Sequence, residues 1–106
     1  MTRDDHLADA AEFDAIADAC LDAAREDDLA AVARTARLSE FRLACHAGTW
    51  TATITRADDP HHPCDGSARD PLLAIRDALR VACCYYHDRA RTCREWAEEE
   101  SDDQTV

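Results

Sequence analysis

The chain has 106 residues, enough for one domain built around one modest hydrophobic core. Its formal net charge is −11, from 23 acidic side chains against 12 basic ones, all of which are arginine. A surface this negative repels nucleic acid and membranes and favours basic partners, although solubility alone is a simpler explanation of the charge. We therefore expect a protein partner with a basic surface, no direct nucleic-acid binding and no membrane association.

The N-terminus, Met1-Thr2-Arg3-Asp4, precedes no apolar stretch of the kind found in signal peptides. This predicts a cytoplasmic protein whose six cysteines are reduced. Two glycines and three prolines in the whole chain favour long helices and few tight turns. We expect a single domain over residues 1–106, with flexible ends at residues 1–4 and 101–106.

A first helix is predicted from about Asp5 to Arg25, because Phe13, Ile16 and Cys20 recur on one of its sides. The apolar phase then jumps at residues 26–28. This predicts a break and a short second helix that is capped at residue 28 and runs to about residue 38. One continuous helix whose two halves pack on different neighbours is the alternative.

Residues 41–46 and 50–55 alternate between apolar and polar side chains, as strands do, and Gly48 lies in the turn between them. The sequence therefore predicts a β-hairpin, followed by a loop over residues 57–63, and it leaves open a short third strand near residues 64–67. Two strands alone are marginally stable, so the hairpin must pack on a helix. Its buried face would hold Phe41, Leu43, Cys45, Trp50, Ala52 and Ile54.

A long C-terminal helix begins where Asp70 can cap it and Pro71 fits the first helical position. It continues to residue 100 without another glycine or proline, and small or apolar residues repeat at steps of three and four. The predicted fold is therefore α+β: an N-terminal helix or helix pair, an antiparallel hairpin and a long C-terminal helix packed on the sheet. The residues of the apolar face are Leu72, Ile75, Leu79, Ala82, Tyr86, Ala90, Cys93 and Ala97.

Two groups of acids could contact a basic partner. Asp14, Asp18, Asp22 and Glu26 form a column at i, i+4 spacing on the first helix, and Glu95, Glu98 and Glu99 lead an acidic C-terminal segment that also contains Asp102 and Asp103. One column rises about 6 Å per step, which is too sparse to imitate the phosphates of a DNA strand at about 3.4 Å. Both groups on one surface would be denser. An arginine-rich column on the long helix, from Arg76 to Arg94, could instead face the Asp14 column within the fold.

Metal and catalytic sites are poorly supported. His61, His62 and Cys64 in a loop, with Cys83 and His87 on the long helix, offer ligand types that zinc prefers, but their spacing matches no zinc-binding pattern. These cysteines and histidines are more simply core and surface residues. Phosphate-binding loops and nucleophile motifs are also absent from the sequence. We therefore expect no catalytic residue, no metal and no cofactor.

Residues 41–82 weakly resemble the hairpin-plus-helix core of HicB-type antitoxins. The resemblance is carried by the Trp50–Thr55 strand, by Pro63-Cys64-Asp65-Gly66 and by the helix opening Pro71-Leu72-Leu73-Ala74-Ile75. In its size, its acidity and its lack of motifs, the chain also resembles phage-encoded anti-defence proteins such as anti-CRISPR inhibitors. That second resemblance implies binding to a basic surface of a defence complex without chemistry.

The sequence thus favours a non-catalytic acidic protein that occludes a basic, nucleic-acid-binding surface through the two acidic groups. The alternative is a small oligomerising or antitoxin-like module with an apolar interface at Tyr85, Tyr86 and Trp96. This alternative leaves room for a homodimer.

Overall fold

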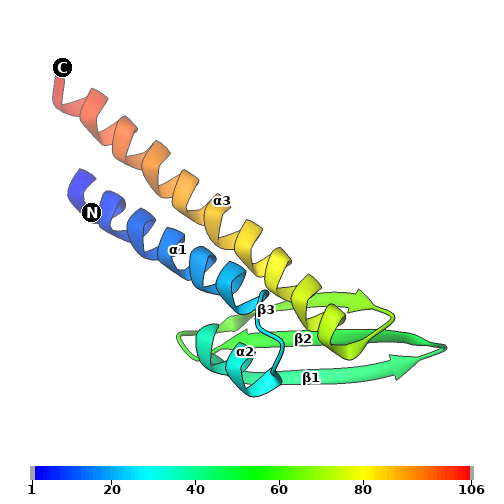
Figure 1. The fold of residues 1–106 in the computed structure, drawn as a ribbon. Helices are drawn as coiled ribbons and strands as arrows, with labels where there is room; N and C mark the ends of the chain where they lie inside the picture. Colours follow the sequence, from blue (N-terminus) through cyan, green and yellow to red (C-terminus); the bar gives the residue numbers. More distant parts are fainter. Residues whose placement is uncertain (1, 106) are drawn as a thin grey trace.

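A computed structural model describes residues 2–105, with side chains up to Glu99. The chain order is α1 (Arg3–Ala23), α2 (Leu29–Thr35), β1 (Leu38–His46), β2 (Thr49–Arg56), β3 (Asp59–Ala68) and α3 (Pro71–Thr105). Figure 1 shows the three strands as one sheet, with α1 and α3 crossing over it side by side. The predicted α+β fold, with the long C-terminal helix on the sheet, is confirmed.

Polar caps fix where the helices begin. Thr2 and Asp5 form a reciprocal capping box at the start of α1, so this helix begins two residues earlier than predicted. Asp28 accepts a hydrogen bond from the amide of Ala30, which confirms the break between α1 and α2. Asp70 accepts from the amides of Leu72 and Leu73 and so caps α3. The predicted extension of α2 to residue 38 is wrong, because Arg37 adopts a positive φ of 54° and β1 follows at once.

The sheet is an antiparallel meander in the order β1-β2-β3. Ala47 and Gly48 turn the chain between β1 and β2, which confirms the hairpin. The loop prediction for residues 57–63 is wrong for Asp59–Pro63, which belong to a ten-residue β3. Two prolines are tolerated there because β3 is an edge strand with an irregular register. Ile54 pairs with Cys64 whereas Arg56 pairs with Asp59, so β3 bulges between these pairs.

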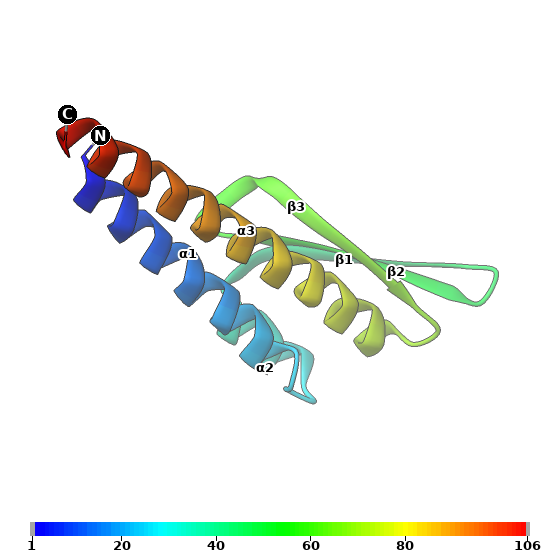
Figure 2. The ribbon, with the colours of Figure 1, turned by 90° about the horizontal axis from the view of Figure 1, so that it is seen from above.

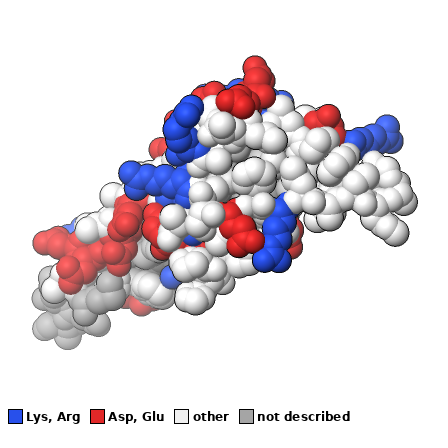
Figure 3. Space-filling model, turned by 90° about the horizontal axis from the view of Figure 1, so that it is seen from below, with Lys and Arg blue, Asp and Glu red and all other residues white. Residues whose placement is uncertain are grey.

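A two-helix arm extends past the sheet. The first half of α1 and the second half of α3 run alongside each other beyond the sheet, and the two ends of the chain lie near the outer end of this helix pair (Figures 1 and 2). We define this arm as residues 3–16 of α1 and 87–99 of α3. The molecule is about 59 Å long and 24 Å across. Seen from below, acidic side chains gather toward the end of the arm, whereas the sheet half carries wide uncharged areas (Figure 3). No helix in the described residues is long and apolar enough to cross a membrane.

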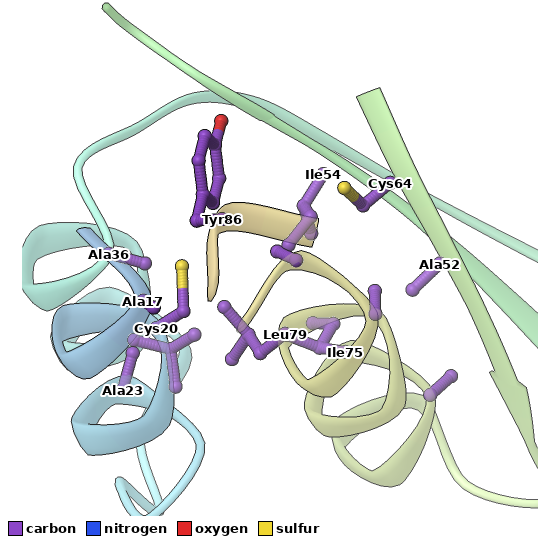
Figure 4. Close-up of a cluster of buried hydrophobic side chains, with 14 residues drawn as sticks. Ala17, Cys20, Ala23, Ala36, Ala52, Ile54, Cys64, Ile75, Leu79 and Tyr86 are labelled. Atoms are coloured by element: carbon purple, nitrogen blue, oxygen red, sulfur yellow. The ribbon is translucent and has the colours of Figure 1, made fainter. Parts of the chain in front are cut away.

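The core lies where α1, α3 and the sheet meet. Figure 4 shows Leu79 and Ile75 of α3 facing Cys20 of α1 on one side and Ile54 of β2 on the other. Seven of the eight residues of the predicted α3 face are buried, and Leu72 is half-buried. Many core positions are alanine, so the backbones approach closely. Gly66 of β3 is one such position, where an added Cβ would lie 2.1 Å from the amide nitrogen of Ala78.

The helices cover β2 and β3 but leave β1 open. Ala52 and Ile54 are buried as predicted, and Leu43 and Trp50 are half-buried. Phe41 and Cys45 were expected on the buried face but are exposed, because α3 packs on the other two strands and α2 touches β1 only near its start. The hairpin tip also projects beyond the start of α3 (Figure 2).

Candidate functional site

Acids from both parts of the chain meet at the end of the arm. The rings of His6 and Trp96 lie 5.6 Å apart, and Ala10 packs with Ala90 and Cys93, so the first turns of α1 lie beside residues 90–96 of α3. This antiparallel register brings together six carboxylates that are exposed or half-exposed. We call them the acidic tip: Asp4, Asp5, Asp9, Glu95, Glu98 and Glu99. Asp102 and Asp103, which the sequence analysis placed in the acidic C-terminal segment, lie beyond the last residue whose side chain the structure describes.

The fold stabilises the charge of one member of the acidic tip, Asp5. The backbone amide of Thr2 donates to Oδ2 of Asp5 at 3.0 Å, and this bond, followed by the Thr2 side chain, lowers the pKa of the Asp5 carboxyl below its usual value. Acids in the first turn of α1 are also favoured by the helix dipole. Glu95, Glu98 and Glu99 lie more than one turn before the end of α3 at Thr105, and Glu95 and Glu99 are like charges at i, i+4 spacing that repel each other. This repulsion has no local benefit, which makes the group a candidate for a role outside the fold.

Asp14 does not belong to a free acidic column. Arg94 donates a hydrogen bond to its Oδ2 at 2.7 Å, and Nδ1 of His87 lies 3.1 Å from its Oδ1. These bonds, that of Arg94 first, lower the pKa of Asp14 below its usual value. This part of the predicted contact between the arginine-rich column and α1 is therefore present. Arg76 reaches Asp27 at 2.8 Å and the backbone oxygen of Glu26 at 3.1 Å, so α3 also holds the link between α1 and α2.

We expect Asp14→Asn to loosen the arm. The substitution removes the charge that Arg94 and His87 share, and both partners are about half exposed, so the loss should be about 1 kcal/mol or less. Because the folded pKa of Asp14 is lowered, its contribution is present above about pH 4 and fades as the pH falls through the folded value. Urea unfolding of both proteins at pH 7 and pH 3 measures this. An equal difference between them at both pH values would contradict the prediction.

The remaining acids of the column point to solvent. Asp18, Asp22 and Glu26 are exposed, and Asp22 lies 3.9 Å from Arg25 in an exposed pair. The column runs from the middle of α1 toward the sheet, away from Glu95, Glu98 and Glu99. The two predicted acidic groups therefore occupy different stretches of the molecule. Asp4, Asp5 and Asp9 are the acids that the fold places beside the C-terminal group, and antiparallel packing of the chain ends is the feature that could have indicated them.

The predicted apolar interface is divided by the fold. Tyr86 is only 2% exposed, so its assignment to a surface contact is corrected: it is a core residue at the centre of α3. Its ring packs between the helices and the sheet (Figure 4). Tyr85 is half-buried and stacks on His62, whereas Trp96 is 42% exposed near the end of the arm. The three side chains therefore form no common patch.

A polar network that the sequence did not reveal lies at the base of the arm. The hydroxyl of Tyr86 donates to Oδ2 of Asp59 at 2.8 Å, and Nδ1 of His62 lies 2.6 Å from Oδ1. Burial, and then the bond to Asp59, raise the pKa of Tyr86 far above its usual value. The network borders a cavity of about 260 Å³ that Phe13 and Arg89 also line. One aromatic ring of the cavity wall already has a partner within the chain, since the guanidinium of Arg89 lies over the ring of Phe13 at 5.5 Å.

The candidate metal ligands are not brought together. In the part of the chain that the structure describes, no three histidine, cysteine or acidic side chains are grouped so as to hold a metal ion. His62 contacts Asp59 and His87 contacts Asp14, while His61 is exposed. Cys64 is buried under α3, and burial raises the pKa of its thiol and that of Cys83. Raised pKa values disfavour the thiolates that metals bind.

Of these features, the acidic tip combines exposure with a high density of like charge. No protein-family model, curated protein or solved structure that we compared is significantly similar to the chain.

Proposed function

We propose that the protein is a non-catalytic binding protein whose acidic tip occludes a basic surface on a partner, a surface that otherwise binds nucleic acid. The observation that carries the proposal is the gathering of acids toward the end of a projecting arm (Figure 3). Acids at the start of α1 favour that helix, but Glu95, Glu98 and Glu99 beside them add like charge that repels and does not stabilise the fold.

The geometry suits imitation of a nucleic acid better than one helix could. Carboxylates on one helix recur about every 6 Å, but a second helix packed at 8–10 Å adds a parallel row. The second row leaves the step along each helix at about 6 Å, longer than the roughly 3.4 Å between phosphates of one strand, but it doubles the number of carboxylates per length of the arm. A basic groove would therefore meet several carboxylates at once, without bases to read.

The rest of the molecule supports this role. The net charge of −11 would speed association with a positive surface and repel competing polyanions. The narrow arm, on a molecule 24 Å across, could enter a groove made for a duplex of similar width. Occlusion of this kind requires no catalytic group. An inhibitor of a nucleic-acid-guided defence complex, as phage-type anti-defence proteins are, fits all of these properties.

Two variants with equal charge change test the proposal. The tip variant replaces Glu95, Glu98 and Glu99 with glutamine, and the column variant changes Asp18, Asp22 and Glu26 to their amides. Each removes three exposed negative charges, so nonspecific electrostatics change equally. The immobilised proteins are exposed to a lysate of the source cells or their host at about 50 mM and 500 mM salt. Circular dichroism verifies that both variants keep their helices.

We expect the parent and the column variant to capture the same basic protein at low salt and to release it at high salt. The tip variant should lose at least tenfold in capture, because screened contacts with charged groups dominate the binding. Equal capture by the tip variant, or loss with the column variant instead, would contradict the assignment to the acidic tip.

A further inference from the structure

The outer edge of β1 is an open strand edge that is regular from Glu40 to His46. β1 spans nine residues, Leu38–His46, contains no proline or glycine, and among the described residues pairs only with β2, with a shift of register at Ser39 near its start. The opposite edge, β3, is interrupted by prolines and a bulge, both of which discourage pairing with another chain. Exposed, regular edges are templates for a further strand.

The apolar face of the sheet beside this edge is also partly exposed. Phe41 is 38% exposed although it pairs with buried Ile54 on the next strand, and Leu43 is half-buried beside Ala52. No helix covers this part of the sheet, since α3 packs on β2 and β3. The apolar face of the sheet thus continues past the helices to the open edge.

We infer that β1 pairs antiparallel with β1 of a second copy of this chain, in the register that places Phe41 opposite Phe41 of the second copy. In this register Glu40 lies opposite Arg42 of the second copy, and Arg42 lies opposite Glu40 of the second copy. The two pairs join the existing bond between Glu40 and Arg42, which is 2.7 Å long, into one alternating cluster of four charges. The result is a six-stranded sheet with both helix layers on the same face.

Charge complementarity selects both the partner and the register. A register centred on Arg42 would oppose two arginines, and one centred on Glu40 would oppose two glutamates, which is unfavourable across strands. An arbitrary peptide would not offer the matching order of charges, whereas a second copy offers it by symmetry. Phe41 and Leu43 of both copies then form one apolar floor at the centre.

The overall charge distribution permits this pairing and disfavours other modes of self-association. β1 and β2 contain one acid, Glu40, against Arg42 and the internally paired Arg56. Pairing at the sheet keeps the two arms at opposite ends of the assembly, and each molecule is about 59 Å long. The two acidic tips are therefore separated by several times the screening length of about 8 Å at physiological salt, so they repel each other little. The acidic tips therefore remain free for their own partner, and the inference does not depend on the function proposed for them.

Charge exchange across the edge tests the inference by sedimentation velocity over a range of protein concentrations. Because Glu40 and Arg42 are exposed, their substitution should leave the fold intact, and circular dichroism monitors this. The parent should be a dimer. Glu40→Arg and Arg42→Glu alone should each weaken dimerisation at least tenfold, since two like-charged pairs then oppose each other. The double exchange, and an equal mixture of the two single variants, should restore it.

A cysteine pair provides the second readout. In a background with Cys45→Ser and Cys84→Ser, the variant Phe41→Cys should form an intermolecular disulfide under mild oxidation, because directly opposed residues lie 4.5–5.5 Å apart. The matched variant Ser39→Cys should not, since residue 39 faces residue 43 of the second copy. A monomeric parent, a dimer insensitive to the exchanges, weakening that the double exchange does not reverse, or cross-linking through residue 39 would each overturn the inference.

Discussion

Gly66→Ala is expected to cost at least about 3 kcal/mol of the free energy of unfolding, and to leave little folded protein if the domain is of ordinary stability. A Cβ at this position would lie 2.1 Å from the amide nitrogen of Ala78 and 2.7 Å from the carbonyl oxygen of Ala74. Both atoms belong to the backbone of α3, so no side chain can move aside. The sheet and the helix would have to separate, which would open the core around Ile75 and Leu79. Urea unfolding followed by circular dichroism measures the loss.

Gly48→Ala is the matched control. Gly48 has a φ of +80°, but an added Cβ would have no atom within 4 Å, so only backbone strain of about 1 kcal/mol applies. Equal losses at both glycines would show that close contact between β3 and α3 does not set the stability. A stable Gly66→Ala protein would contradict the packing described for these two elements.

Asp58→Ala is expected to lower the free energy of unfolding by about 2 kcal/mol, more than the substitution Arg56→Met on the other side of the same ion pair. Arg56 is only 5% exposed, and its Nε and Nη2 donate to the two carboxylate oxygens of Asp58 at 2.9 Å and 3.0 Å. Removing Asp58 leaves a buried guanidinium whose partners are the carbonyl of Ala36, the ring of Tyr86 and the thiol of Cys20, with no carboxylate bonded to it. Because Asp58 is itself 45% exposed, water reduces the penalty below that of a fully buried pair.

Arg56→Met tests the same pair from the other side. Asp58 can then be hydrated, and the methionine fills part of the space, so the variant Arg56→Met/Asp58→Ala should be more stable than Asp58→Ala alone. The hydrogen bonds from Arg56 lower the pKa of Asp58, so the pair stabilises the fold above about pH 4 and less as the pH falls through the folded value. Thermal melting of the four proteins at pH 7 and pH 3 measures this. A double variant less stable than Asp58→Ala would contradict the account.

Local rules were sufficient for much of the fold. The caps at Asp28 and Asp70 predicted where α2 and α3 start, and the spacing along α3 predicted its buried face. What failed depended on contacts remote in sequence. Pro60 and Pro63 suggested a loop, but an edge strand leaves one side of its backbone unpaired and so accepts them. Phe41 alternated correctly, yet it is exposed because α3 lies over the neighbouring strands.

The candidate site was predictable only in part. Acidity at both ends of the chain was visible in the sequence, but its convergence depends on how α1 docks along α3, which no local pattern encodes. The same docking lets Arg94 donate a hydrogen bond to Asp14, so Asp14 is not part of the exposed acidic column. The sequence supported two predictions for Tyr86: its spacing on the helix placed it in the core, and its aromatic hydroxyl side chain suited an interface. Its burial shows that it is a core residue.

Displacement of nucleic acid tests the central claim most directly. The basic protein captured by the parent chain is loaded with its fluorescently labelled nucleic acid, and fluorescence anisotropy is followed as the chain is added. We predict that the parent and the column variant release the nucleic acid completely, and that the tip variant needs at least tenfold more protein to do so. A chain that binds this partner while the nucleic acid stays bound would contradict the claim that the acidic tip occupies the nucleic-acid site.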